Sequence, residues 1–243
     1  MHLVGHNIRN FDVPYLIRWS MLNQVKVPVY LSHLANKKFG KLPTIWVDTN
    51  EFFGASEWGF RVSLNNLSKW TGHEGKNGNG KFFYQLPREE QESYLENDMM
   101  QTRNVFRSMN NYLNAYVEER CVFFDIETAP KGDLELQKLA PDFKEEKVKL
   151  GNIKDPEKRQ AKIEEAREGH FDAIKDKAGL HAQFSDPVAI GYINEGDFGT
   201  CLDFAKKDDP NGSKDLVERF WSRASNLHGS MNELNNYTAN AEF

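Results

Sequence analysis

Two acidic side chains stand two positions apart in an apolar segment of this 243-residue chain. They are Asp125 and Glu127, and Asp125 is the only break in the apolar run Val122–Ile126, which is typical of a strand buried on both faces. Side chains two apart on a strand point to the same side. Buried carboxylates are costly unless they are paired or bind a metal, so one interpretation is that this pair is neutralised by a partner charge or a metal ion. The alternative is that Asp125 caps a turn and Glu127 begins an exposed loop.

A second polar pair follows another short strand, Leu3–Gly5. Asn7 and Asp12 come after its carboxyl end, where open α/β sheets place their ligands. Asp12 also precedes a helix that we expect from Pro14 to Asn23, so a helix cap is the alternative interpretation. We interpret His6 as a strand-end side chain rather than a catalyst.

A third pair lies on a long helix that opens at Pro87. Tyr94 and Asp98 are four positions apart and therefore share one face of this helix. The apolar positions of the helix also form one face; they are Leu95, Met99, Phe106 and Met109. A surface tyrosine and aspartate beside this apolar stripe is the alternative.

The elements that must position these pairs alternate between strands and helices. We expect further strands at Thr44–Asp48, Pro187–Ile193 and Phe198–Phe204, the last two forming a β-hairpin. Further helices are expected at Val62–Trp70, from Asp155 to about Lys177, and at Ser213–Leu227; Gly72–Gly80 reads as a loop. This alternation predicts an α/β protein.

Composition bounds the class of protein. The length fits one α/β domain or two small ones, and 39% apolar residues is ordinary for a globular chain. No apolar run approaches the ~20 residues that span a bilayer, and the N-terminus lacks a signal-peptide pattern. The two cysteines have no metal-ligand spacing and cannot build a disulfide framework. We therefore expect a cytoplasmic protein that does not bind membranes.

The net charge of −5 argues against binding nucleic acid by bulk charge. It does not exclude a nuclease, because clustered carboxylates that bind metals carry negative charge within the site itself.

Taken together, the three pairs resemble the motifs of the DEDD (DnaQ-like) 3′–5′ exonuclease superfamily, tyrosine branch. The segments that carry the resemblance are Phe123-Phe124-Asp125-Ile126-Glu127-Thr128, Gly5-His6-Asn7 to Phe11-Asp12, and Tyr94-Leu95-Glu96-Asn97-Asp98. The charged segment Lys149–Lys158 is similar to an insertion in predicted exonucleases related to the exonuclease domain of family B DNA polymerases, and Val62–Leu67 and the loop Gly75–Gly80 also fit that family.

The resemblance implies a chemistry and a set of roles. It implies two Mg²⁺ or Mn²⁺ ions, with Asp125, Glu127, Asp12 and Asp98 as their ligands. Tyr94 would orient the attacking water, and the substrate-binding residues would be Asn7, Thr128 and Phe11. The implied activity is 3′–5′ exonuclease cleavage of single-stranded DNA. An exoribonuclease of the same superfamily and a catalytically impaired nucleic-acid-binding module are the alternatives.

The order of the motifs is rotated relative to that superfamily, in which the Asp-x-Glu strand comes first. Read from residue 121 and wrapped through the terminus, the elements follow the ribonuclease H-like order: a mixed five-stranded sheet flanked by helices, here circularly permuted. From Asp98 to Tyr112 the long helix would span ~21 Å, enough to reach the end of the sheet where the Asp125 strand begins. We therefore expect the residues from both halves to meet in one crevice.

We expect one exonuclease-like domain over residues 1–228, with a charged helical insertion at 131–182 and a flexible tail at 229–243. Basic residues in the insertion are either a clamp for a nucleic-acid backbone or one side of a solvated helix; they are Lys144, Lys147, Lys149, Lys154, Lys158, Arg159, Lys162 and Arg167. Trp58 and Phe60 are candidates for base stacking, and the other tryptophans, Trp19, Trp46, Trp70 and Trp221, are candidates for the core.

Overall fold

The computed structural model describes residues 2–28, 46–54, 61–75, 80–113, 121–194, 199–206 and 208–239. The strands are β1 (His2–Gly5), β2 (Trp46–Asp48), β3 (Cys121–Pro130), β4 (Ser185–Asn194) and β5 (Gly199–Phe204). The α-helices are α1 (Asp12–Leu22), α3 (Thr49–Phe53), α4 (Leu64–Trp70), α5 (Arg88–Leu113), α6 (Asp133–Leu139), α7 (Pro156–Glu168), α8 (His170–Lys175) and α9 (Gly212–Ala239). Short 3₁₀ helices are η2 (Gly80–Gln85), η4 (Glu145–Lys147) and η5 (Ala178–Leu180).

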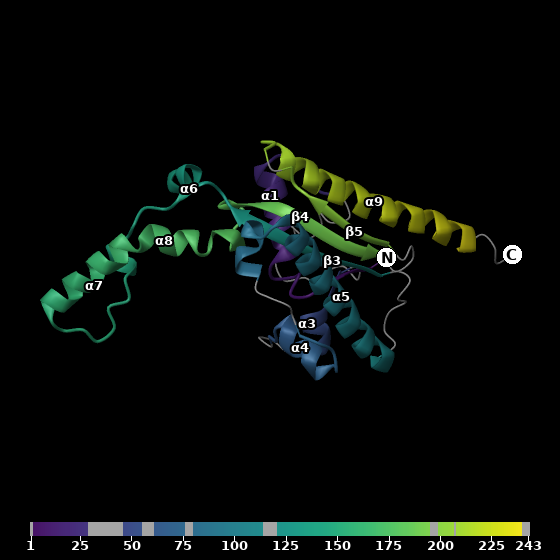
Figure 1. Cartoon of the computed structure of the whole chain (residues 1–243), viewed down its shortest axis with the longest axis horizontal. Coiled ribbons are helices and arrows are strands. Elements are labelled where there is room, and N and C mark those ends of the chain that lie inside the picture. The colour runs from purple at the N-terminus through teal and green to yellow at the C-terminus, as the bar shows by residue number, and fades with distance from the viewer. Residues whose placement is uncertain are drawn as a thin grey trace. The chain divides into compact units, whose positions relative to one another are not determined.

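The five strands form one mixed sheet in the order β2-β1-β3-β4-β5 (Figure 1). β1 runs parallel to both β2 and β3, whereas β4 and β5 form the predicted antiparallel hairpin. The expected five-stranded mixed sheet flanked by helices is confirmed, and its strand order is compatible with a ribonuclease H-like fold.

Alternation along β3 explains how the helices cover the sheet. Phe123 packs edge-to-face on Phe106 of α5, with ring centroids 5.4 Å apart. The next residue, Phe124, packs on Phe220 of α9 at 5.6 Å. Because consecutive strand residues point to opposite faces, α5 covers one face and α9 the other. The sheet is therefore buried on both sides, as the apolar run predicts.

Helix α9 joins α1 on the second face. The indole N–H of Trp221 donates a hydrogen bond to Oγ of Ser20 at 2.9 Å, and both residues are buried. This bond links parts of the chain that are 201 positions apart. The N-terminal and C-terminal segments are thus packed into one body.

On the α5 face, a glycine allows the helix to pack close to the sheet. A Cβ on Gly191 of β4 would stand 2.6 Å from Sδ of Met99 and 2.9 Å from Cγ of Leu95, both buried residues of α5. The predicted apolar face of α5 is confirmed, since Leu95, Met99, Phe106 and Met109 are all buried.

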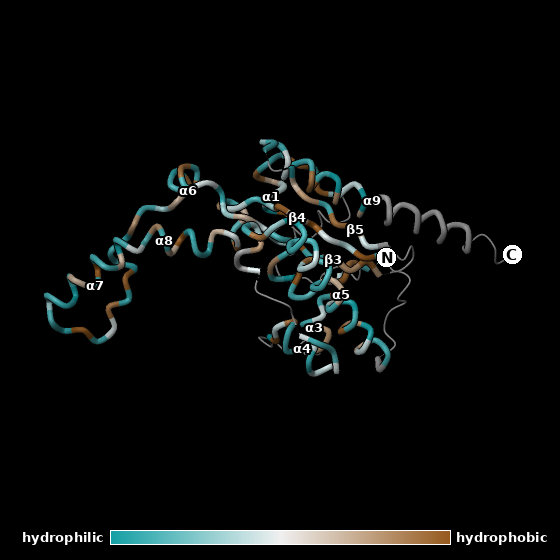
Figure 2. The backbone as a smooth tube through the Cα atoms, viewed as in Figure 1, coloured by the Kyte–Doolittle hydropathy of each residue, from teal (hydrophilic) through white to brown (hydrophobic). Residues whose placement is uncertain are grey.

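The chain divides into two compact units. Unit 1 comprises Met1–Thr128 and Pro187–Phe243, and unit 2 comprises Ala129–Asp186. Unit 2 contains the predicted charged insertion, 131–182. Helix α7 begins as predicted, with Asp155 accepting from the backbone N–H of Glu157 at 2.9 Å. None of the described residues of α7 is buried, and most of the helix is hydrophilic (Figure 2).

Three predicted details are wrong. The helix from Asp155 does not continue to Lys177, because α7 ends at Glu168 and a separate helix, α8, begins after Gly169. Helix α9 does not end near Leu227; it continues to Ala239, where a flexible tail was expected, and residues 240–243 lie outside the described residues. Trp70 is not a core residue, since 63% of it is exposed, beside the ring of Phe53 at 5.9 Å.

Candidate metal centre

Three carboxylates meet on the α5 face of the sheet. They belong to Asp125 and Glu127 of β3 and to Asp98 of α5, and one oxygen from each lies within 4.8 Å of the others. Asp98 is only 3% exposed, whereas Asp125 and Glu127 are half-buried. The spacing of the acidic pair on β3 places both side chains on the same face as Phe123, which is the face that α5 covers.

The packing of α5 on β3 explains why Asp98 reaches this pair. Phe106 contacts Phe123, which fixes the register between helix and strand. From Phe106 back to Asp98 the helix advances about 12 Å at 1.5 Å per residue. From Phe123 forward to Glu127 the strand advances about 13 Å at roughly 3.3 Å per residue. The helix and the strand thus extend by nearly equal distances from the Phe106–Phe123 contact, so Asp98 lies beside the acidic pair of β3.

The three carboxylates can hold a metal ion. Clustered carboxylate oxygens are the donors that Mg²⁺ and Mn²⁺ prefer, and a divalent cation would offset the repulsion of three negative charges at this distance. The prediction that Asp98 meets Asp125 and Glu127 is confirmed, and the three residues form a group that could bind a metal ion. The identity and the number of the ions stay predictions.

Asp12, the fourth predicted ligand, lies next to this cluster. It is the first residue of α1 and 3% exposed. Its carboxylate accepts a hydrogen bond from the backbone N–H of Ile126 and experiences the charge of Asp125. Burial raises the pKa of Asp12 well above its usual value, the charges of Asp125 and Asp48 raise it further, and the backbone hydrogen bonds oppose the shift. The cap of α1 is Phe11 rather than Asp12, and Asp12 instead adds a buried carboxyl group that experiences the charge of Asp125.

A turn fixed by Asp48 carries the chain from β1 to α1. Asp48 ends β2 opposite Gly5 of β1 and is 4% exposed. Its carboxylate accepts from the backbone N–H groups of Asn7 at 2.8 Å, Arg9 at 3.1 Å and Asn50 at 3.0 Å. Burial raises the pKa of Asp48, and these hydrogen bonds oppose the shift. Sequence reasoning missed this residue, although an aspartate at the end of a parallel strand was a usable signal.

Gly5 keeps the same turn close to the sheet. A Cβ on Gly5 would stand 2.1 Å from Cγ2 of the buried Ile8 and 3.2 Å from the carbonyl oxygen of Phe124. A larger residue would therefore push the 6–11 segment away from β3. Asn7 adopts a left-handed backbone conformation with φ of 60°, which asparagine tolerates better than most residues.

Tyr94 lies one helical turn before Asp98 and is 8% exposed. Its ring packs edge-to-face on Phe83 of η2, with centroids 5.8 Å apart. The Tyr94 hydroxyl and Oε1 of Glu127 both lie within 4 Å of the point where a Cβ on Gly80 would stand. The tyrosine hydroxyl therefore faces the same space as a carboxylate of the acidic cluster. Sequence reasoning placed Gly80 at the end of a loop and missed this role.

The predicted substrate-binding residues are Asn7, Phe11 and Thr128. The side chain of Asn7 accepts from the Asn10 amide at 2.9 Å, and Phe11 packs on Tyr15 at 5.6 Å. Thr128 follows Glu127 on β3 and is half-buried. These positions stay predictions as contacts to a substrate. Trp58 and Phe60 lie outside the described residues.

His6 has a structural role. One ring nitrogen bonds to Oγ1 of Thr49 and the other donates to the carbonyl oxygen of Val62, both at 2.9 Å. These contacts tie the end of β1 to α3 and to Val62, two residues before α4 begins. They agree with the interpretation of His6 as a strand-end side chain.

Comparison of the chain with protein-family models, curated proteins and solved structures finds no match. Within the described residues, no helix is both long and apolar enough to cross a membrane.

Proposed function

We propose that this chain is a metal-dependent 3′–5′ exonuclease that hydrolyses phosphodiester bonds at the ends of single-stranded DNA. The observation that carries the proposal is the meeting of Asp98, Asp125 and Glu127 with oxygens within 4.8 Å of one another. A strand and a helix supply these groups, so the site is held by rigid elements of unit 1 rather than by loops. The motif resemblance supports the direction of cleavage and the type of substrate.

Asp98, Asp125 and Glu127 would hold one divalent ion, and Asp125 and Asp12 would hold a second. The donor set fits, because carboxylate oxygens are hard ligands suited to Mg²⁺ or Mn²⁺. When bound, such ions supply a water activated for attack and stabilise the charge that develops on the phosphate and the leaving oxygen. Asp12 accepts a hydrogen bond from the Ile126 amide, which keeps its carboxylate beside Asp125.

Tyr94 would orient the attacking water. Its ring is fixed against Phe83, and its hydroxyl lies close to the same position near Gly80 as Oε1 of Glu127. A phenol hydroxyl can both donate and accept a hydrogen bond, so it can align a water beside the carboxylate. The residue thus contributes to orientation, which is worth large factors in rate when reacting atoms must be aligned.

The proposal is tested with 5′-labelled single-stranded DNA and RNA oligonucleotides incubated with Mg²⁺ or Mn²⁺. We expect a ladder that shortens from the 3′ end and disappears with EDTA or in the Asp125→Asn variant. Preference for the RNA strand would identify an exoribonuclease. A folded protein that binds DNA and leaves it intact with either ion would overturn the proposal and favour a binding module.

A further inference from the structure

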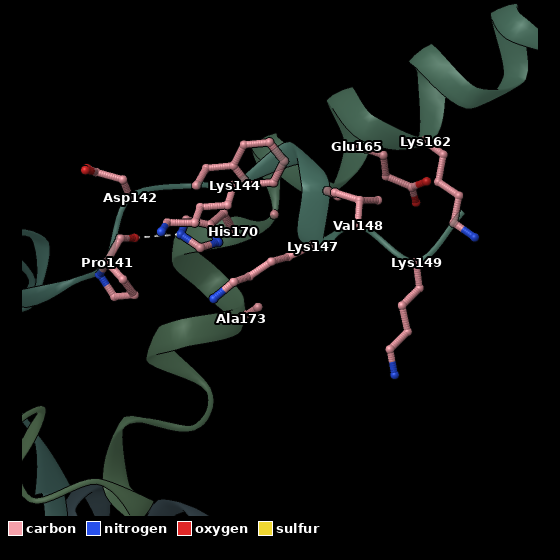
Figure 3. A pocket seen from close by; sticks show the side chains of 13 residues that line it. Pro141, Asp142, Lys144, Lys147, Val148, Lys149, Lys162, Glu165, His170 and Ala173 are labelled. Carbon is pink, nitrogen blue, oxygen red and sulfur yellow. Dashed lines mark hydrogen bonds between the residues drawn. The ribbon is translucent and has the colours of Figure 1, made fainter. Parts of the chain in front are cut away.

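A cavity of about 750 Å³ lies wholly within unit 2, between the segment 141–149 and helices α7 and α8. Its volume is in the range of sites that hold nucleotide-sized ligands, and it is larger than a single phosphate requires. Figure 3 shows side chains reaching it from the segment and from both helices. The acidic cluster of unit 1 contributes none of its lining, so this is a separate site.

Contacts between side chains fix the walls of the cavity. Arg167 of α7 forms an ion pair with Glu145, and its guanidinium lies 5.5 Å from the ring centroid of Phe143. His170 of α8 donates a hydrogen bond to the carbonyl oxygen of Pro141 at 2.9 Å, as Figure 3 shows. The rings of His170 and Phe143 meet edge-to-face at 5.4 Å. The segment 141–149 is therefore attached to the helices, and the cavity is preformed.

The charged residues around the cavity are mainly lysines. Lys144, Lys147 and Lys149 extend from the segment, and Lys162 extends from α7. The two carboxylates in the lining belong to Asp142 and Glu165. Four ammonium groups against two carboxylates make the cavity locally positive in a chain whose net charge is −5. The ligand should therefore be an anion with several charges.

The lining between the lysines is apolar. It includes Pro141, Phe143, Val148, Ala166 and Ala173. A ligand that matches both parts must have anionic groups spaced along a chain and flat apolar groups between them. Single-stranded nucleic acid has this chemistry, with phosphates for the lysines and bases or sugars for the apolar surface.

We propose that this cavity binds a short stretch of single-stranded nucleic acid through Lys144, Lys147, Lys149 and Lys162. The identity of the polyanion rests on the proposed function, whereas the site itself rests on the cavity and its lysines. The cavity would hold part of a strand independently of metal ions, because its lining depends on lysines rather than on clustered carboxylates.

The test measures fluorescence anisotropy of a labelled oligothymidylate in EDTA, so that metal-dependent cleavage does not interfere. The pocket variant replaces Lys144, Lys147, Lys149 and Lys162 with Gln. The matched control replaces four other lysines with Gln; they belong to unit 2 but do not line the cavity, and they are Lys138, Lys154, Lys158 and Lys177. Both variants change the net charge equally. The same four pocket lysines changed to Arg should retain binding, and thermal unfolding verifies that each variant folds.

Each phosphate contact contributes about 0.7 to the slope of log affinity against log salt for single strands, so four lysines contribute roughly 3. We expect the pocket variant to lose about this much slope and to bind at least about tenfold more weakly than the control at low salt. Equal losses in the two variants would overturn the inference. Poly-dT should displace the oligonucleotide at a lower concentration of charged groups than poly-L-glutamate. Equal displacement by the two polymers would also overturn the inference.

A second measurement separates this inference from the proposed function. Thymidine 5′-monophosphate p-nitrophenyl ester is too short to span a second site, so its Mn²⁺-dependent hydrolysis should be equal in wild type, pocket variant and control. If the wild type hydrolyses the ester but the pocket variant and the control bind the oligonucleotide equally well, the proposed binding role of the cavity is refuted and the nuclease stands. No hydrolysis of the ester or the oligonucleotide by wild type, with binding lost only in the pocket variant, would refute the nuclease and leave the cavity standing.

Discussion

Gly80 offers a direct test of how Tyr94 acts, because its environment is defined atom by atom. A Cβ at this position would stand 2.8 Å from the Tyr94 hydroxyl and 3.7 Å from Oε1 of Glu127. Ordinary contact begins near 3.4 Å, so Gly80→Ala displaces the hydroxyl by about 0.6 Å and leaves the carboxylate in place. A 1 Å misplacement of a reacting group can cost about 10²-fold in rate, so we expect kcat to fall roughly tenfold.

The prediction becomes specific in combination with Tyr94→Phe. This substitution removes the hydroxyl that the new methyl group would contact, so Gly80→Ala should cost less than about threefold in the Tyr94→Phe background. A tenfold effect that disappears corresponds to a coupling energy of about 1.4 kcal/mol between the two positions. Since the carboxylates are not displaced, the concentration of Mn²⁺ that gives half-maximal rate should stay the same.

The assay is release of the 3′ nucleotide from 5′-labelled single-stranded DNA under single-turnover conditions. Gly132→Ala is the matched control, because a Cβ there meets no described atom within 4 Å. If Gly80→Ala lowers the rate by the same factor in both backgrounds, the loss does not pass through the Tyr94 hydroxyl and the assigned role is wrong. An increased Mn²⁺ requirement in Gly80→Ala would also contradict the reasoning.

Three further predictions concern stability and metal binding. Burial and the charge of Asp125 raise the pKa of Asp12, so its ionised form costs stability at neutral pH. Asp12→Asn should therefore stabilise the metal-free protein by about 0.5–2 kcal/mol in thermal unfolding while it lowers activity. A variant less stable than the wild type would contradict this reasoning. Mn²⁺ at about 100 times its Kd should add about 2.7 kcal/mol, or roughly 5–11 °C in Tm, and Asp125→Asn should lose most of that shift. Asp48→Ala removes the acceptor of three backbone N–H groups and should cost about 2–3 kcal/mol in urea unfolding, more than Asp48→Asn, whereas equal losses would show that these bonds contribute little.

Much of the sheet was predictable because strong local patterns coincide with burial. The apolar run around Phe123 and Phe124 predicted a strand covered on both faces, and their contacts with Phe106 and Phe220 confirm it. The apolar face of α5 follows the 3.6-residue period and is buried. The meeting of Asp98 with the β3 pair was predicted from the motif resemblance together with the length of the helix that carries Asp98.

The wrong details arise where tertiary contacts or local breaks outweigh the pattern. Gly169 separates α7 from α8 in a charged segment whose helical pattern continues on both sides of it. Trp70 was assigned to the core from its residue type, yet it lies at the end of α4 beside Phe53 with most of its surface exposed. The role of Gly80 depends on Tyr94 and Glu127, which are distant in the chain, so spacing within its own segment carries no signal for it.

The central claim is that carboxylates from both halves of the chain hold the metal ions that cleave a 3′ end. Crystals of the protein soaked with Mn²⁺ and a phosphorothioate oligonucleotide test it most directly through anomalous scattering. We predict a manganese peak among Asp98, Asp125 and Glu127, with the 3′-terminal phosphodiester next to it and the Tyr94 hydroxyl facing its attacked side. Manganese bound elsewhere, or a 3′ end placed away from these three carboxylates, would contradict the claim.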